Sequence, residues 1–589
     1  MKLLATLSFV LGLSQSAYAY PPGSASGTSP SPTLLPYVGA HDGRGHSPPW
    51  GGRTRHSDPD DVPKTGAVRK YEWTVQRTTL APDGFEQSLL TVNGQFPGPL
   101  VEANWGDEVE VTVHNNITGP TEGTAIHWHG IHHHGSPWMD GVSGITQCPI
   151  APGESFTYRW KATTYGSSWW HGHHALQYGG GLWGPIVIHG PSQEYDIDLG
   201  PVTLSDYYHL PYEQVARNAI SNSTDFKVWV PHSDNHLING KNNYNCSMST
   251  TNNKCDSNAE RAQFKFQAGK VHKLRLINTG VQALQIFSID SHKLQVTTMD
   301  WTPVEPYEVD YVALGVGQRA EVLVKATGDP GAAYYMRTRG GTQCATTFVN
   351  ETLATVYYDR APADAVPVPN PYTIPDFTCG NLALPRVKPL FKKPLAKPDI
   401  TLYYNVTFGT NATGHREWYQ NNVTFKADWS RPLLLEAADG NSAYLAEPQH
   451  VLTAIPEKAR HVRVVLNNHF SIHPFHLHGG NFQIVSEGDG RWDGTVLTAA
   501  NPARADTELL RRSGHLVVQF EATNPGVWGF HCHTAWHASV GLYINFLVQP
   551  KAVRKTRIPQ AMRDMCAAWE TYRSSGGENA HPFDSGLRM

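Results

Sequence analysis

The sequence predicts an all-β protein built from three similar domains, and two observations lead to this fold class. Gly (53 residues) and Pro (42 residues) punctuate short stretches in which apolar and polar residues alternate, which is typical of strands joined by turns. Three of these stretches resemble one another, and each runs into Asn, as a half-buried strand entering a turn would. They are DEVEVTVHN (107–115), KVHKLRLIN (270–278) and RHVRVVLNN (460–468). We take Asn115, Asn278 and Asn467 as equivalent positions, and their spacings of 163 and 189 residues predict three repeated β-domains.

The chain begins with MKLLATLSFVLGLSQSAYAY, in which a lysine and a short apolar run precede Ala17-Tyr18-Ala19. This is the form of a cleavable secretory signal, which we assign to residues 1–19, and we expect an extracellular protein. No later stretch has 18 consecutive apolar residues, so no membrane anchor is expected. The net charge of −4 and the lack of a basic run argue against a nucleic-acid partner. Seven Asn-x-Ser/Thr sites fit secretion: Asn116, Asn222, Asn245, Asn350, Asn405, Asn411 and Asn422.

The remaining boundaries follow from composition. Residues 20–65 are rich in Pro, Gly, Ser and Asp without apolar periodicity, and we expect a disordered leader or propeptide there. Proline-rich VPVPNPYTIP and basic RVKPLFKKPLAKP predict a linker over 366–398. The three domains are therefore expected at 66–192, 193–365 and 399–550, followed by a C-terminal segment at 551–589.

Histidine motifs carry most of the candidate chemistry. Among 30 histidines, chance produces roughly one or two His-x-His pairs, so four such motifs in strand-like context indicate metal binding. They are HWHG (127–130), HGH (171–173), HPFHLHG (473–479) and HCHTAWH (531–537). The HHH run at 132–134 lies in a glycine-flanked loop, and we give it, like His174, an ordinary structural role.

Alternation along a strand separates these residues into two sites. Residues two apart point to the same face of an extended chain, so His531 and His533 point one way and Cys532 the other. By the same rule, His473 can turn away from His476 and His478. One site then collects Cys532, His473 and His537. The other collects eight imidazoles: His127, His129, His171, His173, His476, His478, His531 and His533.

Two histidines and a thiolate are the ligand set of a blue-copper electron-transfer centre. Zinc is the alternative, but a zinc site does not require eight more histidines directly behind the cysteine. Metal ligation also explains why one of seven cysteines is left over in a secreted chain. A local bridge, Cys246–Cys255, suits the insertion YNCSMSTTNNKC (244–255).

The four motifs, in this order, resemble those of the multicopper oxidases, and more closely those of ascomycete laccases and laccase-like oxidases. The resemblance covers roughly residues 66–589 and includes VNGQFPGPL (92–100), PWMDGVSGITQCPIAPG (137–153) and NPGVWGFHCH (524–533). It implies three cupredoxin-like Greek-key β-sandwiches and four copper ions, one of type 1, one of type 2 and two of type 3. The type 1 ligands would be His473, Cys532 and His537, and the type 2 ligands His127 and His476. The type 3 pair would take His129, His171, His173, His478, His531 and His533.

The same resemblance implies one-electron oxidation of phenols and aromatic amines, coupled to four-electron reduction of dioxygen to water. His537 would be the entry point for electrons, and Cys532 would pass them to the histidines beside it. Asp140 in PWMDG would supply protons, although a turn residue before Gly141 is its structural alternative. Leu542, ten residues after Cys532, would take the axial position, where a leucine raises the redox potential relative to methionine. The acid that accepts a phenol proton stays open among Asp234, Asp256 and Glu260.

The resemblance further implies the disulfides Cys148–Cys566 and Cys344–Cys379. It also implies cleavage after Leu587, which would leave Asp584–Leu587 as a plug in the channel to the copper cluster. The early cysteine pair of many ascomycete laccases is absent. Other activities of the family stay open: a phenol-coupling oxidase of secondary metabolism, a ferroxidase or a bilirubin-type oxidase. A non-enzymatic copper-binding protein is the remote alternative, and the oligomeric state is left undetermined.

Overall fold

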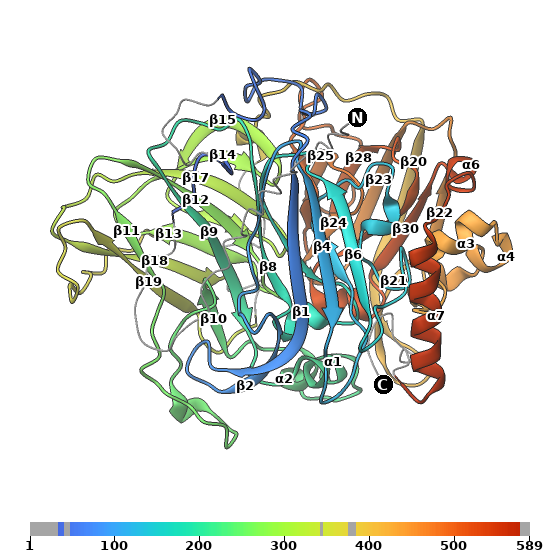
Figure 1. The fold of residues 1–589 in the computed structure, drawn as a ribbon, viewed down its shortest axis with the longest axis horizontal. Coiled ribbons are helices and arrows are strands. Elements are labelled where there is room, and N and C mark those ends of the chain that lie inside the picture. Colours follow the sequence, from blue (N-terminus) through green and yellow to red (C-terminus); the bar gives the residue numbers. More distant parts are fainter. Residues whose placement is uncertain (1–32, 40–46, 342–345, 375–383, 578–589) are drawn as a thin grey trace, which may run out of the picture.

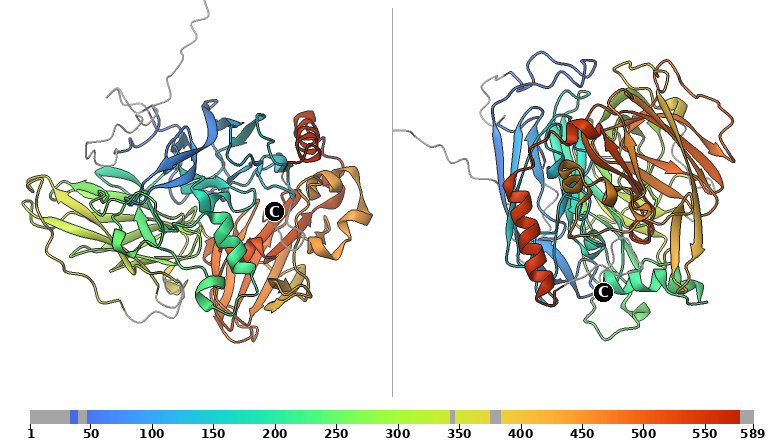
Figure 2. Two further views of the ribbon diagram at one scale, coloured as in Figure 1. Left: turned by 90° about the horizontal axis from the view of Figure 1, so that it is seen from below. Right: turned by 90° about the vertical axis from the view of Figure 1, so that its right-hand side faces the viewer.

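Three β-sandwiches make up the protein, in a computed structural model that describes residues 33–39, 47–341, 346–374 and 384–577. Six sheets pair face to face, which confirms the all-β class and the three cupredoxin-like domains. In Figure 1 the first domain lies in the centre (blue to cyan), the second on the left (green) and the third on the right (orange to red). Seen from below, each domain borders the other two (Figure 2, left).

The first domain pairs two four-stranded sheets. The strand β6 shows why they form a sandwich, because its residues alternate between exposed and buried, with Phe156, Tyr158 and Trp160 facing inward. One sheet has the order β2 (Gln87–Val92), β1 (Val68–Leu80), β4 (Glu108–Asn115) and β6 (Ser155–Lys161). The other has β3 (Val101–Asn104), β8 (Trp183–His189), β7 (Gly166–Gly172) and β5 (Ile126–Trp128).

The second domain has a six-stranded and a five-stranded sheet. The larger has the order β10 (Asn235–Ile238), β9 (Ile197–Tyr207), β12 (Val271–Asn278), β17 (Arg319–Lys325), β14 (Leu294–Met299) and β15 (Thr302–Val309). The smaller has β11 (Gln263–Phe266), β19 (Glu351–Tyr358), β18 (Ala333–Gly340), β13 (Gln285–Ile289) and β16 (Val312–Leu314).

The third domain repeats this plan. Its larger sheet has the order β21 (Arg416–Gln420), β20 (Ile400–Thr410), β23 (His461–Asn468), β28 (Gly514–Glu521), β25 (Phe482–Asp489) and β26 (Arg504–Ala505). Its smaller sheet has β22 (Leu452–Ile455), β30 (Tyr543–Val548), β29 (Gly526–Cys532), β24 (His473–Leu477) and β27 (Thr507–Leu510).

The three stretches that predicted the repeat are the strands β4, β12 and β23, and they are equivalent in topology. Each pairs in parallel with the first long strand of its domain, β1, β9 or β20. On its other side each pairs antiparallel with β6, β17 or β28. The internal repeat read from the sequence is therefore present in the fold.

The choice of Asn467 as the third equivalent residue is wrong by one position. The side-chain amides of Asn115 and Asn278 each donate to two backbone carbonyls across the loop that follows the strand. In the third domain Asn468 does this, at 2.8 Å from both Ser471 O and Arg511 O. Since two asparagines follow one another in RHVRVVLNN, alternation alone could not select the one that points into the loop.

The expectation of disorder for residues 20–65 is wrong for the part that the structure describes. Leu34 N donates to Asp198 O at 2.8 Å, and Val38 N donates to Asn104 Oδ1 at 2.9 Å. Trp50 is 8% exposed and its ring meets Tyr37 edge to face. The segment has little secondary structure of its own, so it shows no periodicity, but it obtains partners from the first and second domains.

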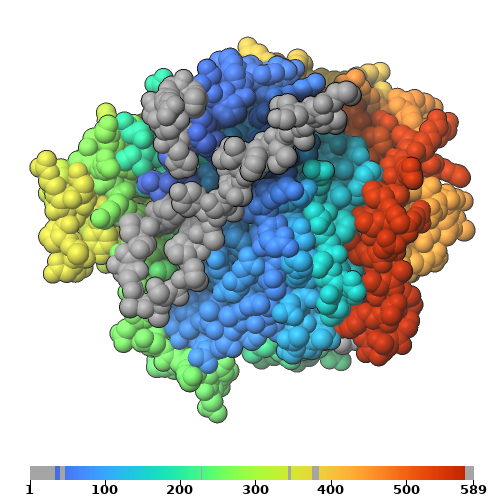
Figure 3. Space-filling view, in the orientation of Figure 1, coloured from blue at the N-terminus to red at the C-terminus, as the bar shows by residue number. Residues whose placement is uncertain are grey.

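Among the described residues, seven helices lie between or after the strands. Two follow β9, and the last packs along the face of the first domain in the space-filling view (Figure 3, red). They are α1 (Tyr212–Ile220), α2 (Phe226–Trp229), α3 (Leu433–Asp439), α4 (Ser442–Leu445), α5 (Ala535–Ser539), α6 (Pro550–Val553) and α7 (Gln560–Ser574). Short 3-10 turns are η1 (Pro137–Met139), η2 (Gln177–Gly180), η3 (Cys246–Met248), η4 (Leu384–Arg386) and η5 (Pro448–His450). Across the described parts of the chain, none of the helices has the length and apolar character needed to traverse a bilayer.

Two predicted disulfides are present. Cys148–Cys566 joins the first domain to α7, and Cys246–Cys255 closes the insertion in the second domain. Among the described cysteines only Cys532 is free, and it is buried. The predicted Cys344–Cys379 pair, the signal segment at 1–19 and the plug at 584–587 lie outside the described residues.

Candidate metal centres

Strand register places the histidine motifs at the junction of the first and third domains. In the first domain β5 pairs with β7 so that His127 lies opposite His171. In the third domain β24 pairs with β29 so that His476 lies opposite His531 and Phe475 opposite Cys532. Because neighbours on a strand point to opposite faces, this register directs the Cys532 side chain away from the histidines on either side of it.

The first group consists of Cys532, His473 and His537. The Cys532 sulfur lies 3.4 Å from His473 Nδ1 and 3.6 Å from His537 Nδ1, and these two nitrogens are 3.1 Å apart. Donor atoms at such separations can share one ion at bonds of about 2.0–2.3 Å. His473 is held by its Nε2, which donates to Phe470 O at 3.0 Å. His537, on α5, is the partly exposed member of the group.

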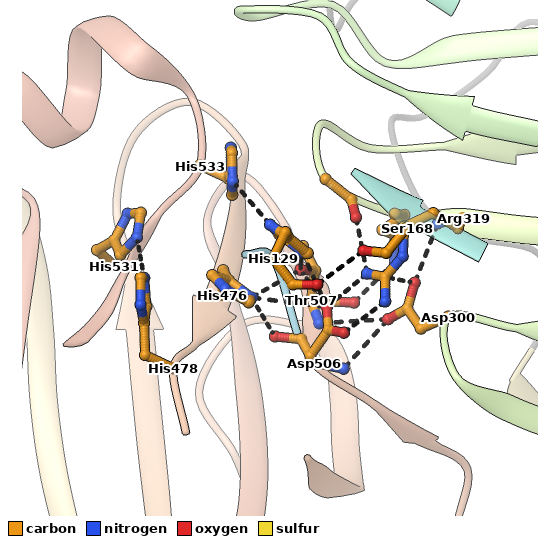
Figure 4. A network of polar contacts seen from close by, with 12 residues as sticks. His129, Ser168, Asp300, Arg319, His476, His478, Asp506, Thr507, His531 and His533 are labelled. Carbon is orange, nitrogen blue, oxygen red and sulfur yellow. Dashed lines mark hydrogen bonds and ion pairs between the residues drawn. The ribbon is translucent and has the colours of Figure 1, made fainter. Parts of the chain in front are cut away.

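The second group brings together the eight predicted histidines. His478 Nε2 lies 3.0 Å from His531 Nε2, and His129 Nδ1 lies 3.2 Å from His533 Nε2 (Figure 4). The remaining four rings join this set, with centroids 4.2 Å apart for His127 and His478 and 3.8 Å for His129 and His476. His171 and His173 complete it, at 5.2 Å and 5.4 Å from the His127 ring.

Most of these rings are oriented by a hydrogen bond from Nδ1. The Nδ1 atoms of His127, His171 and His531 each donate to a backbone carbonyl, at 2.8–3.1 Å. His476 Nδ1 donates to Asp506 O at 3.0 Å, and His478 Nδ1 to Asp140 Oδ2 at 2.9 Å. A bond of this kind fixes the tautomer and leaves the lone pair on Nε2, as in metal sites. The Nε2 atoms of His127, His171 and His476 are buried with no protein partner.

The charge state of the donors suits a cation. Burial lowers the pKa of His473 to about 3, so the ring is neutral and offers a lone pair. Burial raises the pKa of the Cys532 thiol to about 12, and a cation that binds the sulfur removes its proton. A set of buried, neutral imidazoles with unpartnered nitrogens is costly unless something binds them. The donor set of imidazole and thiolate is the one that copper prefers.

Asp140, the predicted proton source, lies beside the second group. Its carboxylate accepts from His478 Nδ1 and lies 3.3 Å from His127 Nδ1. It is buried, with Oδ1 lacking a hydrogen-bond partner. Burial opposes ionisation, but His478 and His127 outweigh it and lower the pKa of Asp140 well below its usual range. The carboxylate thus connects two histidines of the cluster.

Three residues on the opposite side of the cluster were not predicted from the sequence. Asp506 Oδ1 lies 3.1 Å from His129 Nε2, and Thr507 Oγ1 lies 3.3 Å from the same nitrogen. Arg319, from the second domain, bonds both oxygens of Asp506 (Figure 4). No motif in the sequence marks these residues, and Asp506 does not stand out in ARADTELL (503–510), where Arg504 and Glu508 are also charged.

Histidines given a structural role stay apart from both groups. His133 is buried and lies 3.9 Å from Asp140 Oδ1 but belongs to no cluster of ligand atoms among the described residues. His134 is exposed. His174 Nδ1 contacts Ser143 Oγ at 3.2 Å, and its ring packs on Trp429.

A small cavity lies beside the histidine cluster. It has a volume of about 60 Å³ and is lined by His171, His173, His531 and His533 together with apolar, tyrosine and serine side chains. Trp429, which lies on its wall, packs against Trp569 of α7. The cavity is large enough for small molecules such as water, and the C-terminal helix lies beside it.

An aromatic patch borders the first group. Trp418 is nearly fully buried, and its ring lies 4.4 Å from that of His473 and 4.8 Å from that of His537. Phe408 packs on Trp418 with ring centroids 4.7 Å apart, and it also contacts Trp229 and Phe470. The patch comprises Phe226, Trp229, His232, Phe348, Phe408, Trp418 and Phe470. Three of its members are unusually exposed: Phe226 (54%), Phe348 (51%) and Phe470 (40%).

Of the three acids left open, Asp234 connects to this region. It is half-buried, its Oδ2 accepts from His209 N at 2.8 Å, and burial raises its pKa. Ser233 N, next to Asp234 in the sequence, donates to Thr346 O, and Thr346 Oγ1 accepts from Gln282 Nε2. The backbone oxygen of Val281, the residue before Gln282, accepts from Ala535 N at the start of α5, the helix that carries His537. In contrast, Asp256 and Glu260 are exposed, and Asp256 N donates to Gly84 O of the first domain.

Comparisons with known proteins agree with this arrangement. Models of a family described as multicopper oxidase match residues 74–193, 198–361 and 419–552. An oxidoreductase named OpS5 from Beauveria bassiana is 36% identical, with 96% of each chain covered. Dihydrogeodin oxidase from Aspergillus terreus is 34% identical, covering 88% of this chain and 89% of its own. The crystal structure of a laccase from Botrytis aclada superposes with a TM-score of 0.84 at 32% identity, covering 92% of this chain and 99% of that one.

Proposed function

We propose, from the premise that this chain belongs to the multicopper oxidase family, that it is a secreted laccase-type enzyme. It oxidises phenols and aromatic amines by one electron each and reduces dioxygen, with four electrons and four protons, to two waters. The observation that carries this proposal is the position of Cys532, whose sulfur meets His473 and His537 while its sequence neighbours His531 and His533 face the histidine cluster.

The residues fit four copper ions. Cys532, His473 and His537 would hold the type 1 ion, and His127 and His476 the type 2 ion. The type 3 pair would take the other six: His129, His171, His173, His478, His531 and His533. Bound there, copper would supply the one-electron steps and the place where dioxygen is reduced.

The protein's own part is to connect the two sites and to keep them apart from solvent. The chain from Cys532 to either neighbouring histidine is a single residue long, which is the shortest covalent route between the groups. Asp140, bonded to His478 and close to His127, would deliver protons to the cluster. The cavity lined by His171 and His533 would admit dioxygen to the cluster.

The substrate class follows from the surface at His537. The aromatic patch presents ring faces and edges beside the partly exposed ligand, and such surfaces pack on planar aromatic rings. Asp234 is the proposed acceptor of the phenol proton, since burial raises the pKa of this carboxylate and makes its ionised form a stronger base. The fully buried Leu542 is the proposed axial residue.

A phenol-coupling oxidase of secondary metabolism is the second candidate. Dihydrogeodin oxidase, whose name gives dihydrogeodin as its substrate, is about as similar to this chain as the Botrytis aclada laccase is. Both candidates use the same copper chemistry, and they differ in how narrowly the substrate site selects its phenol.

Metal analysis and a visible spectrum of protein purified from culture medium test the proposal. We expect about four copper ions per chain and the intense blue absorption of a cysteine–copper centre, whereas a colourless zinc protein would overturn it. A steady-state panel of simple phenols, larger phenols, ferrous iron, ascorbate and bilirubin then separates the candidates. Broad turnover of phenols supports a laccase, and turnover of one phenol class supports the coupling oxidase.

A further inference from the structure

The second domain holds none of the proposed copper ligands, yet one of its turns lies against the histidine cluster. The turn joins β16 to β17 and contains Gly317 and Gln318, and β17 begins at Arg319. A Cβ atom on Gly317 would lie 2.9 Å from His129 Cε1 and 3.1 Å from His533 Cδ2. Gly317 has φ +86°, a conformation that favours glycine. Only a residue without a side chain lets the backbone approach both histidines this closely.

Arg319 extends from this turn into the third domain. Its Nη1 and Nη2 donate to the two oxygens of Asp506 at 2.7 Å and 2.6 Å, a bidentate pair (Figure 4). Asp300 contacts the same guanidinium at 3.2 Å and accepts from Asp506 N at 3.1 Å. Arg319 and Asp506 are both fully buried, so neither can exchange its partner for water.

Asp506 in turn orients histidines from two domains. Its Oδ1 lies 3.1 Å from Nε2 of His129 in the first domain. Its backbone oxygen accepts from Nδ1 of His476 in the third domain at 3.0 Å. His129 is thereby turned the opposite way from most of the cluster, because its Nε2 faces the carboxylate and its Nδ1 faces His533.

Asp506 lies where a metal ligand could lie, but both of its carboxylate oxygens are already bonded to Arg319. Its oxygens lie close enough to the nitrogens of His129 and His476 for the three residues to hold an ion together. Arg319, however, occupies both carboxylate oxygens, and a carboxylate bonded in this way has a weaker attraction for a further cation. Arg319 therefore keeps Asp506 as a hydrogen-bond acceptor for histidine and disfavours its binding to metal.

We propose that Arg319 is a positioning residue for the histidine cluster, through which the second domain sets the orientation and ligating nitrogen of His129. This inference rests on the proposed copper cluster. Loss of the arginine would free Asp506 to rotate or to compete for copper, and would leave a buried charge unpaired. Outer-shell partners of this kind contribute roughly ten- to hundred-fold to metal affinity.

The test compares Arg319→Gln and Arg319→Lys with the wild-type protein. Each is stripped of metal, reloaded with copper and dialysed against graded concentrations of a chelator, and copper per chain is measured together with the blue absorption and the thermal midpoint. We expect the glutamine variant to lose cluster copper at roughly ten- to hundred-fold lower chelator strength, while the blue absorption of the Cys532 centre remains. The lysine variant should lie between, since it keeps the charge but not the two parallel hydrogen bonds.

Arg337→Gln is the matched control, because Arg337 is also a buried arginine of the second domain paired to a carboxylate. Its Nε and Nη2 bond Asp290 at 2.6 Å and 2.8 Å, and it makes none of the contacts that Arg319 makes with the third domain. We expect this variant to lower the thermal midpoint without weakening copper retention. If the Arg319→Gln protein does not fold, the lysine variant decides the question.

Two results would overturn the inference, and they are distinguishable. Arg319 variants that retain cluster copper as firmly as the Arg337 control would refute the positioning role and leave the proposed function intact. A wild-type protein that binds no copper at the histidines would refute both.

Discussion

At the scale of single residues, the proposed function depends most on Cys532. Its sulfur lies between His473 and His537, and it is the one free cysteine among those described. Its sequence neighbours His531 and His533 point the other way, toward His478 and His129. A substitution at this position therefore affects one group of ligands and leaves the other in place.

We expect Cys532→Ser to abolish the blue absorption and phenol oxidation while most cluster copper is retained. A serine hydroxyl is a poor ligand for the type 1 ion, whereas the histidines next to it keep their orientation from the backbone. Copper analysis and spectroscopy of the purified variant check this. Phenol oxidation at the wild-type rate would show that electrons do not enter through Cys532.

Leu542→Met should lower the redox potential of the type 1 centre. Leu542 is fully buried, and its carbonyl accepts from Cys532 N at 3.2 Å, so the residue is held against the strand that carries the sulfur. A thioether at the axial position stabilises cupric copper, which a leucine cannot do. A redox titration measures the change, and a rise in potential would count against Leu542 as the axial residue.

Asp234→Asn separates proton transfer from electron transfer. The amide is nearly isosteric with the carboxylate but cannot accept the phenol proton, so kcat/KM for phenols should fall roughly 100-fold. A one-electron donor without an ionisable proton should be oxidised at nearly the wild-type rate. Asp256→Asn, on an exposed loop residue, is the control. Equal losses for both kinds of donor would mean that Asp234 only supports the structure.

At the scale of elements, each domain closes the loop after its central strand with one asparagine amide. Asn115, Asn278 and Asn468 each donate to two backbone carbonyls, and each carboxamide oxygen accepts from the amide two residues later. One side chain thus satisfies three backbone groups that would otherwise be buried without partners. The same device recurs three times because the three domains share one topology.

The neighbouring residue Asn467 provides a matched comparison for this device. Asn468→Ala should lower the free energy of unfolding by about 1–3 kcal/mol, because two carbonyls lose their donor. Asn467→Ala should cost less than about 1 kcal/mol, since its amide makes a single long contact of 3.4 Å with Asn405. Urea unfolding of both variants measures the difference, and a larger loss for Asn467 would restore the register read from the sequence.

At the scale of the whole molecule, segments outside the sandwiches hold the domains together. The segment around Leu34 and Val38 bonds both the first and the second domain, and Cys148–Cys566 ties α7 to the first domain. Arg319 connects the second domain to the third. The candidate centres lie where the domains meet, so these connections determine whether the ligands stay in register.

Trp50→Ala tests whether the N-terminal segment belongs to the folded body. The ring is 8% exposed and packs on Tyr37, so its removal should lower the free energy of unfolding by roughly 3 kcal/mol. Tyr403→Ala, at a side chain that is 59% exposed, should cost far less. Chemical unfolding followed by tryptophan fluorescence and circular dichroism measures both. Equal stability of Trp50→Ala and the wild type would restore the interpretation as a disordered leader.

The sequence by itself determined the strand-based fold, the repeat and the division of histidines between two groups. These features depend on local chain geometry, in which side chains alternate with a period of two. The alternation around Cys532 therefore predicted which residues share a face without any knowledge of the partner strands. The disulfides Cys148–Cys566 and Cys246–Cys255 were also predicted correctly, the first from family resemblance and the second from its short spacing.

The tertiary structure alone decided which buried polar residues support the cluster. The alternation along β12 predicts an exposed position for Arg275. The side chain is instead buried, and it bonds Asp198 and Glu321. Arg319 and Asp506 are 187 residues apart and meet only because the second and third domains pack together. The order of two adjacent asparagines and the packing of Trp50 have the same cause. Each depends on contacts between distant segments, and the periodicity of a single strand carries no information about its partners.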